Sequence, residues 1–122
     1  MQAALENVPI PKGSSLRYLW APGEQFVPVW HFHSECELML VERSRGLRFI
    51  GDCIEPFQEG DLVLVGPNLP HAWMNHEAPA PREIRYNATV SILIQFRTDF
   101  LGSTLWKSPE FSPIRGLLQL SR

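Results

Sequence analysis

The stretch WHFHSECELMLV, residues 30–41, places two histidines and a glutamate at even spacings. His33 lies two residues after His31, and Glu37 lies four residues after His33. Because alternate side chains of a β-strand leave from the same face, a continuous strand would point all three in one direction. A short bend at Ser34 and Glu35 would only loosen this arrangement. The stretch therefore predicts a cluster of polar side chains on one face of a strand.

A fourth candidate, His71, ends the segment GPNLPH, residues 66–71. Three imidazole nitrogens and one carboxylate oxygen form a ligand set for a divalent metal ion with open coordination positions, and they suit Zn²⁺, Fe²⁺, Mn²⁺ or Ni²⁺. The same four side chains equally suit a metal-free polar pocket, because buried imidazoles need only hydrogen-bond partners. Trp73 is predicted to share the face of His71, where it either stacks on a bound ring or packs in the core.

The composition is that of one domain with a substantial core. The chain has 122 residues, of which 44% are apolar, and it includes four tryptophans and seven phenylalanines. A net charge of −2 without a basic run argues against a nucleic-acid-binding surface. The two cysteines indicate reduced thiols rather than a disulfide framework. No apolar run approaches the ~20 residues that span a bilayer, and no leader opens the chain, so we expect a cytoplasmic protein without a membrane partner.

Short runs of strand-forming residues recur every 8–12 residues or so, with turns that contain glycine or proline between them. The predicted strands cover residues 16–20, 27–33, 37–42, 47–50, 53–57, 62–65, 71–74 and 83–96. This spacing, without a helix between strands, predicts an all-β sandwich or barrel over residues 16–97. Residues 1–15 show no period and contain several prolines and glycines, so we expect a flexible or extended amino-terminal arm.

The period changes in residues 98–122, which predict a helical segment. Ser112 and Pro113 suit the cap and the first position of a helix. Apolar residues then recur at helical spacing and form one stripe: Ile114, Leu117 and Leu118. The stripe continues towards Arg122 without a capping residue, which favours a longer natural chain or a docking partner for the helix. A frayed helix packed on the barrel is the alternative.

The motif His31-x-His33-x-x-x-Glu37, followed by Gly60-Asp61 and Pro70-His71, resembles the two cupin motifs. This resemblance implies a double-stranded β-helix, or jelly-roll barrel, with a short carboxyl-terminal helical segment. Two turns depart from the family pattern. Ser44 stands where the first motif usually has glycine, and Gln58 stands where the second usually has proline. The four candidate ligands are all present.

Residues 30–73 resemble, more narrowly, the amino-terminal cupin sensor domain of AraC-type (AraC/XylS family) transcription regulators. The resemblance implies an effector-sensing and dimerisation domain that is not an enzyme. A small polar, sugar-like effector would contact the four candidate ligands and one aromatic: His31, His33, Glu37, His71 and Trp73. The segment 98–122 would be a helical linker of a homodimer. DNA would be bound only by a carboxyl-terminal domain that lies beyond this chain.

Two other functions remain open at this point. The four ligands suit a small metal-dependent cupin enzyme, such as a dioxygenase or an isomerase, which would use the open coordination positions for its substrate. The third interpretation is a binding or storage module with the same barrel and no DNA-binding partner domain. Stoichiometric, tightly held metal would favour the enzyme.

Overall fold

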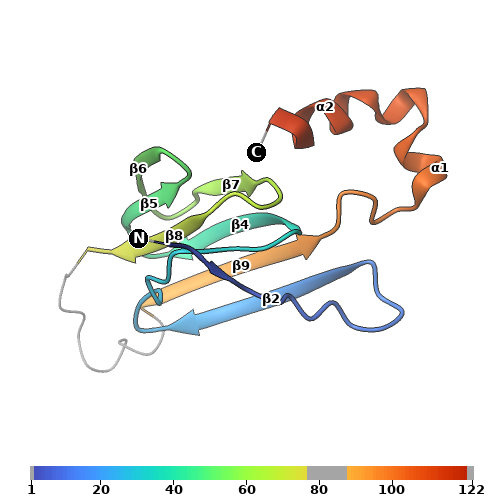
Figure 1. Ribbon diagram of the computed structural model, residues 1–122. Helices are drawn as coiled ribbons and strands as arrows, with labels where there is room; N and C mark the ends of the chain where they lie inside the picture. Colours follow the sequence, from blue (N-terminus) through green and yellow to red (C-terminus); the bar gives the residue numbers. More distant parts are fainter. Residues whose placement is uncertain (1, 77–87, 121–122) are drawn as a thin grey trace.

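Two sheets packed face to face form the body of the molecule (Figure 1). This computed structural model describes residues 2–76 and 88–120. The first sheet has the strand order β1 (Ala4–Leu5), β3 (His31–Phe32), β8 (His71–Asn75), β5 (Gly46–Ile50) and β6 (Cys53–Phe57). The second has the order β2 (Leu16–Gly23), β9 (Thr89–Phe96), β4 (Cys36–Arg43) and β7 (Leu62–Val65). The all-β sandwich or barrel predicted from the strand spacing is therefore confirmed.

The register of the second sheet sets the layout of the interior. Strands β2, β9 and β4 align so that Arg17, Gln95 and Glu37 form one cross-strand row. Two residues further along, Leu19, Leu93 and Met39 form the next row on the same face. Because alternate residues of a strand share a face, both rows line one side of the sheet. A polar row therefore borders an apolar row between the two layers.

The core fills the space between the sheets with side chains from both. Its buried cluster consists of Met39, Val41, Phe57, Val65 and Trp73. Trp73 comes from the first sheet, whereas Met39, Val41 and Val65 come from the second, so the cluster holds the two layers together. Burial of large apolar side chains is the dominant favourable term in such packing.

The observed strands differ from the predicted ones in several places, and β2 continues to Gly23 rather than ending at residue 20. A strand was expected over residues 27–33, but β3 contains only His31–Phe32, because Pro28 lacks an amide hydrogen for a ladder. The arm was expected to be flexible or extended, and its residues Ala4–Leu5 are extended and pair in parallel with β3. The main-chain amides of Ala4 and Glu6 donate to the carbonyls of Trp30 and Phe32, at 3.0 and 2.9 Å. The predicted strand 83–96 is observed from Thr89, and residues 83–87 lie outside the described residues.

A turn of unusual backbone geometry joins β4 to β5. Ser44, which stands at the usual glycine position of the first cupin motif, adopts a φ of 128°. The Asn75 side chain donates to the Ser44 hydroxyl and holds it there. Gly46 lies so close to β8 that a Cβ atom on it would come within 2.0 Å of the Met74 carbonyl oxygen. Glycine is thus required two residues after the position where the motif has it.

The carboxyl-terminal segment is helical, as predicted, and lies beyond the end of β9 (Figure 1). It consists of α1 (Ser103–Trp106), a 3₁₀ turn (Pro109–Phe111) and α2 (Ser112–Leu120). Arg115 donates to the carbonyl oxygens of Trp106 and Ser108, which ties α2 to the preceding turn. None of the helices in the described part of the chain is long and apolar enough to cross a membrane.

Candidate metal centre

The four candidate ligands come from both sheets. His31 on β3 is paired in register with His71 on β8, so the two imidazoles lie side by side in the first sheet. Glu37 belongs to β4 of the second sheet. His33 lies between β3 and β4, where the chain bends at Ser34 and Glu35 and passes from one sheet to the other. The bend considered at Ser34 and Glu35 is therefore present, and it brings His33 and Glu37 together across the interior.

The side chains converge on a common point. The ligating nitrogens of His31, His33 and His71 all lie within 4.8 Å of one another. The two Glu37 oxygens lie 3.2 Å from His33 Nε2 and 3.6 Å from His71 Nε2. Nitrogen and oxygen ligands bind first-row metals at about 2.0–2.2 Å, so ligand atoms around one ion are separated by about 3–4 Å. The structure thus brings together all four side chains that the sequence analysis grouped as candidate ligands, although His71 is distant from the other three in the chain.

The imidazole rings are oriented as metal ligands usually are. Each Nδ1 atom lies within hydrogen-bond distance of a main-chain carbonyl oxygen, which can only accept, so each Nδ1 carries the hydrogen. The three acceptors, at 2.7, 2.9 and 2.7 Å from His31, His33 and His71, belong to Val29, Glu35 and Leu69. In the neutral imidazole the lone pair then resides on Nε2, where a metal ion can bind, and such a contact fixes the tautomer of a ligating histidine. In the metal-free centre a protonated His33 instead donates from Nε2 to Glu37 Oε1.

One nitrogen at this point has no partner. His71 is 0% exposed, and its Nε2 atom has no hydrogen-bond partner among the described residues. Glu37 Oε2, at 3.6 Å, is beyond hydrogen-bond distance and, as a carboxylate oxygen, offers no hydrogen to a lone pair on Nε2. An unpaired buried polar atom costs about 1–3 kcal/mol, and coordination to a cation would remove this cost. The donor set and the orphaned nitrogen both fit a divalent metal ion.

The charge at the centre resides on Glu37. Burial alone would raise the pKa of this carboxyl group, but its interactions with the imidazoles of His33 and His71, and then the hydrogen bond from Gln95, outweigh burial and hold the pKa far below its ordinary value. Burial likewise lowers the pKa of His33, and the hydrogen bond and negative charge of Glu37 outweigh it, so the net shift is upward. Glu37 is therefore an anion at neutral pH, as a ligand to a cation needs to be.

Behind Glu37 lies a polar row that the sequence did not reveal. Gln95 Nε2 donates to Glu37 Oε1 at 2.9 Å, and Arg17 Nη1 donates to Gln95 Oε1 at 3.1 Å. The two contacts fix the orientation of the Gln95 amide, because its oxygen faces the guanidinium and its nitrogen faces the carboxylate. The only sequence signals were two polar residues, Ser91 and Gln95, within the otherwise apolar run 90–96 and one charge in the strand 16–20.

The amino-terminal arm contributes a second carboxylate. The pairing of β1 with β3 places Glu6 beside His31, with Oε2 at 3.3 Å from His31 Nε2. The Glu6 side chain is 40% exposed, so this carboxylate lies between the His31 imidazole and the solvent. Nothing in the period-free sequence of the arm indicated this contact.

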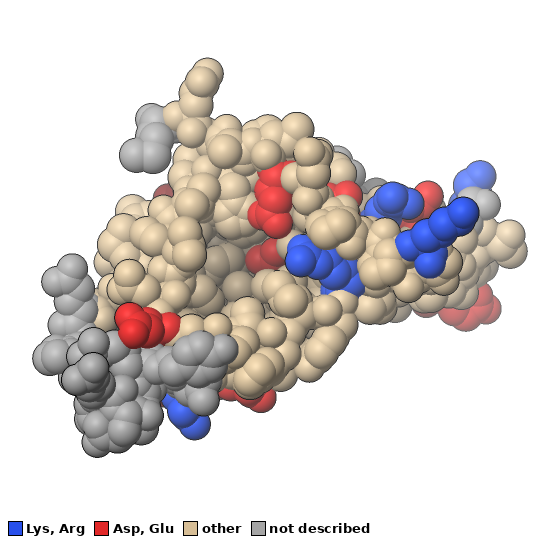
Figure 2. Space-filling view, turned by 90° about the horizontal axis from the view of Figure 1, so that it is seen from below, with Lys and Arg blue, Asp and Glu red and all other residues tan. Residues whose placement is uncertain are grey.

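A cavity of about 210 Å³ adjoins the centre. Its polar lining comprises Glu6, Arg17, His31, Glu37 and Gln95. Its apolar lining includes Leu19, Phe26, Met39, Trp73 and Leu93. Trp73 was predicted to line a pocket or to pack in the core. It does both, because it is 4% exposed, belongs to the core cluster and contacts the His71 ring edge-on at 5.7 Å. In the face drawn in Figure 2, acidic and basic groups border a hollow.

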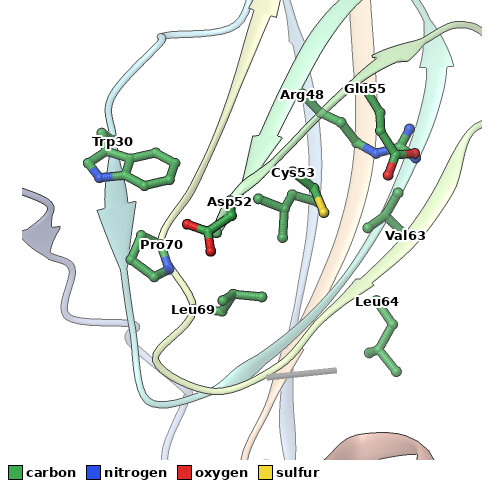
Figure 3. A pocket seen from close by; sticks show the side chains of 11 residues that line it. Trp30, Arg48, Asp52, Cys53, Glu55, Val63, Leu64, Leu69 and Pro70 are labelled. Atoms are coloured by element: carbon green, nitrogen blue, oxygen red, sulfur yellow. The ribbon is translucent and has the colours of Figure 1, made fainter. Parts of the chain in front are cut away.

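A larger hollow of about 690 Å³ lies away from this centre, between the β5–β6 hairpin and β7 (Figure 3). Trp30, Leu69 and Pro70 provide part of its lining, and Arg48 lies at one end next to Glu55. The Arg48 guanidinium is neutralised by Asp61 and Glu55, at 2.6 and 2.9 Å. Among the described residues, no group of metal-ligating side chains gathers at this hollow, so we assign the chemistry to the smaller cavity.

Comparisons with known proteins support the fold and not a family. No protein-family model matches the sequence, and no curated protein matches it significantly. The structure is similar to that of a cupin 2 conserved barrel domain protein from Salinispora arenicola, with 17% identity, a TM-score of 0.53, and 77% of this chain and 74% of that chain covered. It is also similar to the protein NMB1881 from Neisseria meningitidis, with 12% identity, a TM-score of 0.50, and 79% and 88% covered. The barrel is therefore a cupin fold.

A third similar structure corrects one expectation. Pac13, described as a nucleoside dehydratase, shares the fold with 14% identity and a TM-score of 0.54, over 70% of this chain and 62% of that chain. This chain thus spans less than two thirds of Pac13. The resemblance to a sensor domain implied that the chain is not an enzyme. That expectation is wrong, because the fold does not exclude catalysis: a protein described as a nucleoside dehydratase has the same fold.

Proposed function

We propose that the chain is a cupin domain that holds a divalent metal ion with His31, His33, His71 and Glu37, and that binds a small polar molecule in the adjoining cavity. The observation that carries this proposal is the convergence of three Nε2 atoms whose Nδ1 atoms are all committed to carbonyl oxygens. Four such ligands suit Zn²⁺, Fe²⁺, Mn²⁺ or Ni²⁺.

When bound, the ion would supply Lewis-acid polarisation of an oxygen of the small molecule. The residues of the chain have separate roles around it. Gln95 keeps the Glu37 carboxylate oriented, and the three carbonyl oxygens keep the imidazoles in the required tautomer. The apolar wall formed by Phe26, Leu93 and Trp73 excludes water from one side of the cavity.

Metal analysis tests this proposal. Purified protein is stripped with a chelator, reloaded with each of the four ions, and measured by elemental analysis and by thermal denaturation. We expect about one ion per chain and a higher melting temperature, since an ion that binds only the folded state stabilises it. His71→Ala should lose both the ion and the shift. His76→Ala is the matched control, because His76 is exposed and outside the cluster.

The opposite result would contradict the proposal. A chain that binds no metal, or that binds it equally well without the His71 imidazole, would leave a metal-free polar pocket as the better account of the four side chains.

We also propose, as a second candidate, that the domain senses an effector within a dimeric AraC-type regulator. The observation in its favour is the helical tail, in which Ile114 and Leu117 are 46% and 57% exposed. On the barrel, Tyr18 and Trp20 on the outer face of β2 are also more than half exposed. Exposed apolar groups of this size favour association with another protein surface. DNA would then be bound by a domain outside this sequence.

Sedimentation of the wild type, Leu117→Glu and Tyr18→Glu tests this second candidate. A homodimer that dissociates when Leu117 is replaced, and whose stability changes with a bound small molecule, would support it. A monomer at all concentrations, unaffected by either substitution, would contradict it.

A further inference from the structure

The cavity beside the metal centre contains more hydrogen-bond donors than its own acceptors satisfy. Trp73 lines the cavity and is 4% exposed, and its Nε1 atom has no hydrogen-bond partner among the described residues. An indole nitrogen can only donate. A buried tryptophan usually finds an acceptor, so the unpaired Nε1 points to an acceptor that a bound molecule would provide.

Arg17 supplies the positive charge in the same cavity. It is the one cation among the described residues that line this cavity, and it is half-buried on the inner face of β2. Its Nη1 atom donates to the neutral amide of Gln95, and no carboxylate of the described residues forms an ion pair with it. A guanidinium has five donors in a planar fork that matches a carboxylate.

The volume of the cavity and the charges of its lining residues restrict the ligand further. About 210 Å³ is below the ~300–1,000 Å³ of pockets for drug-sized molecules, so only a few heavy atoms fit. Glu6 and Glu37 also line the cavity, and they would repel a molecule with several negative charges. Apolar side chains such as Phe26 and Leu93 suit a short hydrocarbon body.

We propose that this cavity recognises a small monocarboxylate, whose oxygens accept hydrogen bonds from Arg17 and from Trp73 Nε1 and whose short apolar body lies against Phe26 and Leu93. The inference deepens the proposed function, because the carboxylate would bind beside the ion at the metal centre. A bound cation would also offset the negative charges of Glu6 and Glu37 and so strengthen the binding of the anion.

The test uses butyrate, with butyramide as its uncharged counterpart of the same shape and inorganic phosphate as the alternative anion. Binding is measured by calorimetry or by NMR titration of the metal-loaded and the chelator-treated wild type. The variants are Arg17→Gln, Arg17→Lys and Trp73→Phe, with Arg97→Gln as the control, because Arg97 is exposed and does not line the cavity. Elemental analysis and thermal denaturation of every sample record its metal content and folding.

We expect butyrate to bind the wild type, and butyramide and phosphate to bind about tenfold more weakly or not at all. Arg17→Gln should weaken butyrate binding by about tenfold or more, as expected for a lost charge-assisted hydrogen bond, while Arg17→Lys should retain part of it. Trp73→Phe should weaken it by a smaller factor, and Arg97→Gln should not change it.

Four results would overturn the proposal. The first two are a metal-loaded wild type that fails to bind butyrate and one that binds butyrate and butyramide equally well. The other two are Arg17-dependent binding of phosphate that is tighter than that of butyrate, and a folded Arg17→Gln variant that keeps the wild-type affinity for butyrate. Failure of the metal centre gives a different pattern. Arg17-dependent butyrate binding by a protein that takes up no metal would support the carboxylate site and contradict the metal-dependent function.

Discussion

The Gln95 amide donates a hydrogen bond of 2.9 Å to the Glu37 carboxylate, although the two residues are 58 positions apart in the chain. Both side chains are nearly inaccessible, with 2% and 3% exposed. Their positions follow from the register of β4 and β9, in which Glu37 is the partner of Gln95. The carboxylate is thus oriented by a neighbour that belongs to neither histidine motif.

Gln95→Leu should therefore weaken metal binding without removing a ligand. Groups that orient metal ligands typically contribute about 10- to 100-fold to affinity, and we expect a loss in this range. The metal-free protein should also lose about 1–3 kcal/mol of stability, because a buried carboxylate oxygen loses its donor. A competition titration with a chromophoric chelator and urea denaturation measure the two effects. Gln58→Leu, at an exposed turn, should show neither, and equal affinities for both variants would refute the assigned role.

The metal-free protein should have a stability maximum in mildly acidic solution. The pKa of His33 is raised from 6.5, so its contribution is complete below pH 6.5 and is lost as the pH rises through the shifted value. The pKa of Glu37 is lowered from 4.5, so its contribution is complete above pH 4.5 and is lost as the pH falls. Melting temperatures of chelator-treated protein should therefore peak between these values.

Metal-loaded protein should behave differently above pH 6.5, because the ion takes the place of the proton on His33. Its melting temperature should stay high where that of the metal-free protein declines. The Glu37→Gln variant should lose most of the pH dependence in its metal-free form. A metal-free wild type whose stability is flat from pH 4 to pH 8 would contradict the assignment of the buried pair.

Glu6→Gln should have a mild effect on the metal centre. The carboxylate lies 3.3 Å from His31 Nε2 but is 40% exposed, so solvent screens its attraction to a cation. We expect metal affinity to fall about two- to fivefold, which is the usual range for a partly exposed charge pair. The same chelator competition measures it, with Glu24→Gln at an exposed position as the control. A loss as large as that of His71→Ala would instead make Glu6 a full ligand.

Two glycines should respond in opposite directions to replacement by alanine. A Cβ atom on Gly46 would lie 2.0 Å from the Met74 carbonyl oxygen, so Gly46→Ala should destabilise the fold by about 1–3 kcal/mol or more. Gly116, within α2, has open space where a Cβ atom would lie, and Gly116→Ala should favour the helix by about 1 kcal/mol. Urea denaturation and circular dichroism measure the two effects. A Gly46→Ala variant as stable as the wild type would contradict the close contact between Gly46 on β5 and Met74 on β8.

The sequence was sufficient for most of the strand layout and for the four residues that converge. His31, His33 and His71 could be found because even spacing and the cupin-like motifs identify them locally. Glu37 was found by the same spacing, and the bend considered at Ser34 and Glu35 is present after His33. The sequence did not indicate that this bend carries the chain from one sheet to the other, where the side chains still point into a common interior.

Arg17, Gln95 and Glu6 could not be found in the same way. Each is isolated among residues of another kind, and its role depends on which strands are neighbours and in which register they pair. Pairing between β2, β9 and β4 links residues from three distant segments, and the hydrophobic pattern of each strand does not specify it. The short strand β1 is fixed by the available edge of β3 rather than by its own composition.

The passage of the chain between the sheets at Ser34 and Glu35 has a mechanical consequence. Two of the imidazoles belong to one layer and the carboxylate to the other, so an ion at their meeting point would act as a cross-link between the layers. Amide protons in β4 and β8 should consequently exchange more slowly together when the ion is added, because opening either layer would first require release of the same cation.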